Sequence, residues 1–312
     1  GRKLGSSGLG IIALADRITG VLIVLVLFGI PQAIIKFVAI AIGKNNKNQA
    51  SSYLFTSSAI VAVLALIISL IGYYFSYDLS INIFNEPKLI IPLKIAFLAI
   101  IPQAFIRIFS SYLNGFGKIW QSHFSGITLS IFLVLIGLLI LNLNETDINI
   151  VNVAIVYAIA KCIAVIIIFI YVVRFIDYKN KKKFYFKLLM RTAAPLLVVS
   201  STTVLASNAD VIMIGWLCDP SEVGLYNVAA KIAFLSGLFL YVSNSAIAPK
   251  IAMLFEQKRV EEMKVMVQNI TRLLIVSSFL FITLIYFLDD EIISLWGNEF
   301  SGAYTILVIL SI

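Results

Sequence analysis

Six ionisable side chains lie inside long apolar segments of this sequence. They are Asp16, Arg17, Lys161, Asp210, Lys231 and Arg272. If these segments cross a membrane, each charge costs roughly a few kcal/mol or more, and each is therefore a candidate for function. The cations outnumber the acids, and this balance favours the binding of an anion such as a diphosphate. The alternative is that Arg17 and Lys231 pair with Asp16 and Asp210 only to hold helices together.

Polar side chains recur at helical spacing around two of these charges. In one segment the spacing is 3, 4 and 3 residues, and the row consists of Ser200, Thr203, Ser207 and Asp210. In the next segment a similar row consists of Asn227, Lys231, Leu238, Tyr241 and Ser245. Residues with this spacing share one face of a helix. Two such faces on neighbouring helices predict a water-filled cavity, although Ser and Thr also form ordinary hydrogen bonds between membrane helices.

The sequence lacks the residue sets of covalent and metal chemistry. It contains one histidine and two cysteines far apart in the sequence, which give no metal-ligand spacing and no disulfide framework. No Ser-His-Asp order, HExxH motif or phosphate-binding glycine loop is present. We therefore expect no enzyme activity, no metal and no cofactor. Any energy source would be Na⁺, H⁺ or the membrane potential rather than ATP bound to this chain.

The composition identifies the class of protein that must position these charges. The chain has 312 residues, of which 61% are hydrophobic and 13% charged, and its mean hydropathy is +1.01. An ordinary soluble domain is about 45–50% apolar and about 25% charged. The composition therefore predicts an all-α, polytopic membrane protein. The net charge of +8 is explained by basic cytoplasmic loops, and we expect no nucleic-acid partner.

A membrane-spanning helix needs about 20 mostly apolar residues. Eight complete spans are predicted, with a ninth beginning near residue 300; they cover residues 9–42, 47–76, 88–113, 118–142, 148–176, 188–217, 221–254 and 260–288. Most Lys and Arg residues fall in alternate loops, above all in the loop 177–187, and most acids fall in the others. The positive-inside rule then places the loop 177–187 in the cytoplasm and the start of the first span outside.

The chain contains an internal repeat with an offset of 214 residues. At this offset Gly10 falls on Gly224 and Arg17 falls on Lys231, and the rhythm of helices and loops stays in phase. The offset covers an even number of spans, so the repeats are parallel, a plan found in transporters. The repeat predicts lobes at 1–176 and 188–312, joined by the basic linker 177–187. We expect one span before residue 1, at least two after residue 312, and at least twelve in all.

Several stretches are similar to a known family. Residues 209–215 (ADVIMIG) and 223–232 (VGLYNVAAKI) resemble an AD-hydrophobic-G helix end followed by a V-G-x-Y-x-x-A-x-K/R helix start. Residues 245–251 (SAIAPKI) and 296–300 (WGNEF) fit as well, whereas Asn114 replaces a basic residue of the family. The chain thus resembles polysaccharide exporters and O-antigen (Wzx-type) flippases of the multidrug/oligosaccharidyl-lipid/polysaccharide (MOP) superfamily.

The resemblance implies a MATE-like bundle of two six-helix lobes around a central cavity. It also implies that an undecaprenyl-diphosphate-linked oligosaccharide moves from the inner to the outer leaflet of a bacterial or archaeal cytoplasmic membrane by alternating access. The diphosphate would bind Arg17, Lys161 and Lys231. Asn227 would line the same cavity, and Asp16 and Asp210 would pair with the cations or bind a coupling ion. Expected partners are this lipid, membrane lipids and other polysaccharide-assembly proteins.

Three alternatives stay open at this stage. A cation-coupled multidrug (MATE-type) exporter would need acids in its cavity. A flippase for another lipid-linked cargo, such as a peptidoglycan precursor or a teichoic acid unit, would share the cationic cavity. A scaffold within a glycan-assembly complex would tolerate neutral substitutions at Arg17, Lys161 and Lys231.

Overall fold

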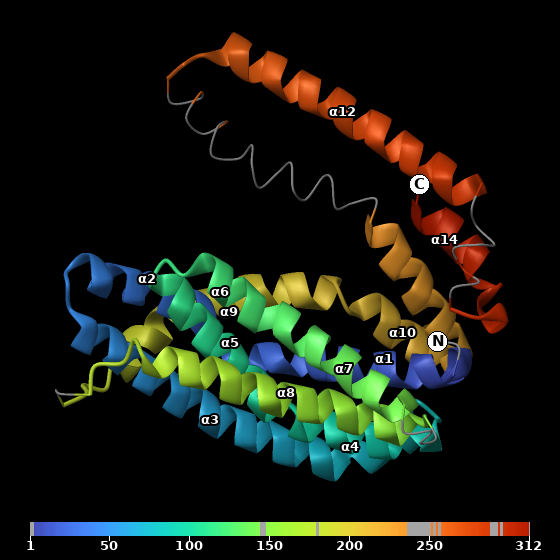
Figure 1. Ribbon diagram of the computed structural model, residues 1–312, viewed down its shortest axis with the longest axis horizontal. Helices are drawn as coiled ribbons and strands as arrows, with labels where there is room; N and C mark the ends of the chain where they lie inside the picture. The colour runs from blue at the N-terminus through green and yellow to red at the C-terminus, as the bar shows by residue number, and fades with distance from the viewer. Residues whose placement is uncertain are drawn as a thin grey trace. The chain divides into compact units, whose positions relative to one another are not determined.

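The computed structural model describes residues 3–143, 148–178, 181–235, 251, 254, 257–287, 293 and 296–311. In these residues every regular element is a helix (Figure 1). Seven helical stretches are long and apolar enough to cross a membrane, and they cover Gly5–Leu27, Lys47–Ile83, Pro87–Gly115, Ile119–Leu143, Ile150–Val173, Phe186–Ala206 and Val260–Thr283. They correspond to seven of the eight predicted spans. The remaining one, 221–254, lies partly outside the described residues.

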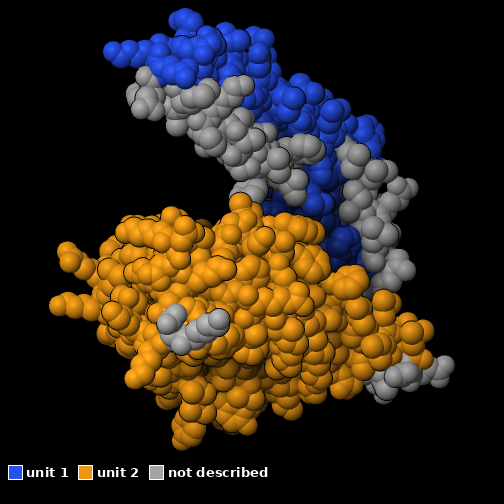
Figure 2. Space-filling view, turned by 60° about the vertical axis from the view of Figure 1, so that its left-hand side comes forward, with its two compact units in different colours: residues 1–10, 220–312 blue, residues 11–219 orange. Residues whose placement is uncertain are grey.

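The chain forms two compact units, coloured separately in Figure 2. One unit comprises residues 11–219, and the other comprises residues 1–10 and 220–312. The repeat predicts another division of the chain, into lobes at 1–176 and 188–312, and these lobe boundaries stay a prediction.

The unit 11–219 is a bundle of helices that lie side by side in Figure 1. Its α-helices are the part of α1 (Gly5–Leu27) from residue 11 on, α2 (Ile30–Gly43), α3 (Lys47–Asp78), α4 (Ile90–Leu98), α5 (Ile100–Gly115), α6 (Ile119–His123), α7 (Leu129–Leu143), α8 (Ile150–Val173), α9 (Phe186–Ala206) and α10 (Ala209–Leu217). Short π and 3₁₀ turns cover Leu79–Ile83, Pro87–Leu89 and Phe124–Thr128. Helix α5 lies at the centre, packed against α2, α3 and α8. Its Tyr112 and Leu113 are fully buried.

The first predicted span, 9–42, is two helices rather than one. The backbone takes positive φ angles at Phe28 (47°) and Gly29 (69°), which end α1, and Pro31 lies at the start of α2. Proline is favoured in a first helical turn because its missing N–H has no partner there. A side chain on Gly29 would collide with the backbone of α9 at Ala193 and Leu197. The predicted span is therefore divided by a full break directly before Pro31.

Three other prolines lie within the predicted spans. Pro102 lies in the first turn of α5, directly after the break from α4 at Ala99, where Ser69 donates a 2.8 Å hydrogen bond to the carbonyl of Phe97. Pro195 is accommodated inside α9 without ending it. Pro249 lies outside the described residues. The span 188–217 is nevertheless divided, because α9 ends before Ser207 and α10 begins after Asn208.

The linker after α8 is fastened to α3 by backbone hydrogen bonds. The N–H groups of Asp177, Lys183 and Tyr185 donate to the hydroxyls of Ser51 (2.8 Å), Ser52 (3.1 Å) and Thr56 (3.1 Å), respectively. These three hydroxyls are buried, and each donates its own proton to a carbonyl one turn earlier in α3. Every described polar group of this contact is thus satisfied, as buried polar groups need to be.

The second unit contains residues 220–235, which are helical, together with α12 (Val260–Phe287), α14 (Ala303–Ser311) and a 3₁₀ turn at Asn298–Phe300. Its apolar cluster is built around Val228, Ile232, Phe300 and Leu307. Leu9, from the first residues of α1, packs against this cluster.

Candidate functional site

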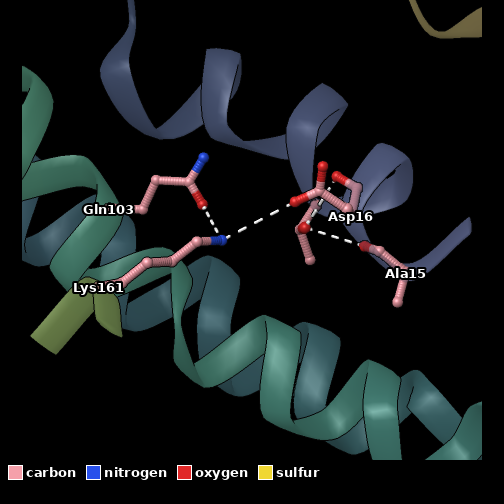
Figure 3. A network of polar contacts seen from close by, with 5 residues as sticks. Ala15, Asp16, Gln103 and Lys161 are labelled. Carbon is pink, nitrogen blue, oxygen red and sulfur yellow. Dashed lines mark hydrogen bonds and ion pairs between the residues drawn. The ribbon is translucent and has the colours of Figure 1, made fainter. Parts of the chain in front are cut away.

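Helices α1, α5 and α8 bring three polar side chains together inside the unit 11–219. The ammonium of Lys161 on α8 donates a 2.8 Å hydrogen bond to Oε1 of Gln103 on α5. The same nitrogen lies 3.9 Å from Oδ1 of Asp16 on α1. Figure 3 shows Lys161 pointing between the other two side chains. The apolar faces of the three helices pack around them, so the fold holds a charged group within a largely hydrophobic bundle.

The two charged partners are covered to very different extents. The side chain of Lys161 is 15% exposed, whereas that of Asp16 is 59% exposed. Buried charges need hydrogen-bond partners or counter-ions, because a buried charge without them loses the free energy of hydration without compensation. Gln103 supplies the short contact to Lys161, and Asp16 supplies only a long one. The ion pair is therefore loose, and the Asp16 carboxylate faces open space.

A cavity of about 370 Å³ adjoins this group. Its polar lining consists of Asp16, Gln103, Ser130, Tyr157 and Lys161. The other lining residues are apolar and belong to α7: Ile131, Val134, Leu135 and Leu138. Ligand sites commonly have about 300–1,000 Å³, mostly apolar walls and a few convergent polar groups. This cavity has those properties, and it is large enough for a charged head group but not for an oligosaccharide.

Arg17, which follows Asp16 on α1, faces a different partner. Its guanidinium nitrogen Nη1 donates to Oδ1 of Asn208 (3.3 Å) and to the carbonyl of Ser207 (3.4 Å). These acceptors lie at the break between α9 and α10, where helix carbonyls have no partner within the helix. Arg17 therefore closes the broken end of α9 and does not pair with Asp16. The alternative that Arg17 and Lys231 pair with Asp16 and Asp210 to hold helices together stays a prediction; in this structure Arg17 bonds to Asn208 and Ser207, and Asp16 lies near Lys161.

Asp210, Asn227 and Lys231 lie on other segments. Asp210 is in the first turn of α10, and its carboxylate accepts a 2.8 Å hydrogen bond from the N–H of Val211. It does not continue the face of Ser200 and Thr203, because the break at Asn208 interrupts the helical period. Asn227 is buried (3% exposed) and Lys231 is exposed; both belong to the helical residues 220–235. Within the unit 11–219, the structure thus brings together Asp16 and Lys161 of the predicted set.

Gln103, Tyr157 and Ser130 also line the cavity but were not predicted from the sequence. Gln103 is an amide within the apolar stretch 100–106, next to Pro102, and this was the available signal. Tyr157 precedes Lys161 by one helical turn, so their shared face could also have been inferred. Ser130 carries no distinguishing pattern. Within the described residues, no group of three or more His, Cys, Asp or Glu side chains could hold a metal ion.

The fold and the site together describe a polytopic membrane protein with a cavity that is lined by a lysine. Residues 1–255 match the family described as polysaccharide biosynthesis protein. The chain belongs to this family of polysaccharide exporters within the MOP superfamily. No curated protein matches the chain.

A solved structure has the same fold. It is described as the inward-facing conformation of a multidrug resistance MATE family transporter of the MOP superfamily. The similarity covers 99% of this chain and 73% of that one, with a TM-score of 0.76 and 14% sequence identity. The all-α, MATE-like fold predicted from the sequence is confirmed, and so is the multi-pass membrane character. Both the family and the fold are those of transporters.

Proposed function

We propose that the protein is a flippase, not an enzyme, which moves a diphosphate-linked lipid oligosaccharide from the inner to the outer leaflet of a bacterial or archaeal cytoplasmic membrane. The observation that carries the proposal is the Lys161 ammonium, with one acceptor at hydrogen-bond distance, in the wall of a cavity whose surface is mostly apolar. Membership of the polysaccharide biosynthesis family supports a glycan cargo.

Lys161 would bind a phosphate oxygen of the cargo. An ammonium has three donors, and the structure engages one of them at hydrogen-bond distance, with Gln103. The carboxylate of Asp16 lies 3.9 Å from the same nitrogen, which is too distant for a hydrogen bond. A phosphate entering the cavity would complete the coordination and displace Asp16, which is free to turn toward the open side. Charge-assisted hydrogen bonds of this kind are the strong ones.

The cavity would receive only the charged part of the cargo. Its volume suits a diphosphate, and the polyprenyl chain would stay among the lipids. Arg17 is engaged at the α9 break, so we assign it to holding α1 against α9 rather than to direct cargo binding. Lys231 and Asn227 stay proposed contributors from the second repeat. Asp16 and Asp210 stay proposed ion-coupling residues, with Na⁺, H⁺ or the membrane potential as the driving force.

A multidrug exporter would require a cavity with a net negative charge. Here the single described carboxylate of the cavity faces a lysine, and the exposed Arg107 lies one helical turn beyond Gln103 on α5. Nothing in this arrangement favours an organic cation.

The proposal is tested with the purified full-length protein and three probes: a short polyprenyl diphosphate, the matching polyprenyl alcohol, and the organic cation ethidium. We expect the diphosphate to bind more tightly than the alcohol, and Lys161→Gln to remove the difference. Equal binding of diphosphate and alcohol would overturn the proposal. Ethidium binding that is lost in Asp16→Asn would support the drug exporter instead.

A further inference from the structure

Two buried glycines meet where α1 packs against the helical residues 220–235. A Cβ atom added to Gly10 would overlap the carbonyl oxygen of Pro220 and would lie 2.9 Å from the amide nitrogen of Gly224. A Cβ atom added to Gly224 would overlap the carbonyl oxygen of Ser6 and would lie 3.3 Å from the amide nitrogen of Gly10. The two backbones therefore touch directly, without intervening side chains.

The contact is symmetric under the internal repeat. The offset of 214 residues that places Gly10 on Gly224 also places Ser6 on Pro220. Each glycine thus faces the carbonyl four residues before its own repeat mate. The crossing point is therefore formed by two repeat mates. It gives the repeat register support that is independent of the few sequence identities.

Small residues spaced four apart allow membrane helices to approach until their backbones touch. Contacts of Cα–H groups with carbonyl oxygens at such crossings are individually weak. They hold two smooth surfaces together without interlocking side chains. Such a surface can separate and close again without repacking, which an interdigitated leucine contact could not do.

A carboxylate from the second repeat reinforces the same contact. Oε2 of Glu299 accepts a hydrogen bond of 3.2 Å from the N–H of Ser6. This N–H belongs to the first turn of α1, which begins at Gly5, and a negative charge there is favoured by the helix dipole. Glu299 is exposed, so water can replace this bond when the contact opens.

We propose that the Gly10–Gly224 contact, capped by Glu299, is the outer gate of the transporter. The loop charges place the start of α1 on the outer side of the membrane, and alternating access requires the repeats to part there when cargo leaves. The contact is made while the outer side is closed and is broken when it opens. This inference uses the transporter fold and the predicted topology but not the identity of the cargo.

The first test replaces each glycine by alanine in the full-length protein. A reporter cysteine, Ser130→Cys, is placed in the cavity wall after Cys162→Ser and Cys218→Ser have removed the native thiols. We expect Gly10→Ala and Gly224→Ala to increase labelling by an impermeant maleimide added outside by severalfold, because the gate cannot close. Gly43→Ala is the matched control, because a Cβ there meets nothing within 4 Å. Well-expressed glycine variants with unchanged labelling would overturn the gate.

The second test does not depend on the glycine substitutions. Ser6→Cys and Glu299→Cys are joined by a short, reducible bifunctional thiol reagent in the cysteine-free background. We expect the cross-link to stop cargo export and outside labelling of Ser130→Cys, and a reductant to restore both. Continued labelling after cross-linking would overturn the gate. If labelling responds to the cross-link but lipid-linked glycan is never moved, the gate stands and the proposed cargo fails.

Discussion

Lys161 and Asp16 form an ion pair with a separation of 3.9 Å, in which the cation is largely buried and the carboxylate is largely exposed. A stable structural pair would have both groups covered and in direct contact, since only close and well-bonded partners offset the loss of hydration. The geometry instead describes a cation whose counter-ion can be exchanged. An anionic ligand is the natural replacement.

Lys161→Gln is expected to lower export by about tenfold or more, because a hydrogen bond to a charged group contributes about 1.5–3 kcal/mol. Glycan at the cell surface is measured against the amount of protein in the membrane. The matched control is Lys94→Gln. Lys94 also lies within a span, but its ammonium sits 5.3 Å from the Tyr73 ring centroid and does not line the cavity. Equal effects of both substitutions would contradict a specific role for Lys161.

Asp16→Asn is expected to increase the affinity for a polyprenyl diphosphate. Loss of the competing carboxylate leaves Lys161 more available, and for a loose, exposed pair the gain is at most about 1 kcal/mol, or about fivefold in affinity for a polyprenyl diphosphate. Export should nevertheless fall, because the ligand is released less readily. Titration of the purified variant measures the affinity. Weaker diphosphate binding in Asp16→Asn would mean that Asp16 is not a counter-ion in competition with the cargo.

Gln103→Glu is expected to reduce diphosphate binding more than Gln103→Met does. Both remove the amide that holds Lys161 at 2.8 Å, but glutamate also places a permanent counter-ion beside the ammonium. Binding titrations of the two variants provide the comparison. If both variants bind alike, charge competition at Lys161 is not what controls ligand affinity.

Thr56→Val is expected to destabilise the protein by about 1–3 kcal/mol, because it leaves the partly buried N–H of Tyr185 without an acceptor. Thermal unfolding in detergent is the measurement. Thr202→Val is the control, since that hydroxyl is exposed and bonds only within its own helix, to the carbonyl of Val198. If Thr56→Val leaves the unfolding temperature unchanged, as the control does, the linker is not held by α3.

The fold was largely predictable, because apolar length and loop charge are strong signals in membrane proteins. Seven predicted spans correspond to helices of the structure. The breaks were harder to foresee. Pro31 indicated one of them, but the division of α9 from α10 at Asn208 has no proline or glycine to mark it, and it depends on Arg17 arriving from a distant helix to cap it.

The site was predictable only in part. Charges inside spans identified Asp16 and Lys161, since any such charge needs an explanation. Their pairing was not foreseen, because it depends on how α1, α5 and α8 pack and not on spacing within one helix. Gln103 was not predicted for the same reason, because a neutral amide becomes a candidate only once a cation is known to lie beside it.

The central claim is that a lipid-linked, diphosphate-bearing glycan crosses the membrane through this protein. The most direct measurement depletes the full-length protein and probes intact and opened cells with an impermeant glycan-binding reagent. We predict that the lipid-linked oligosaccharide accumulates and is detected only after the cells are opened, and that Lys161→Gln fails to reverse this whereas Lys94→Gln succeeds. Undiminished exposure of the oligosaccharide on intact, depleted cells would contradict the account.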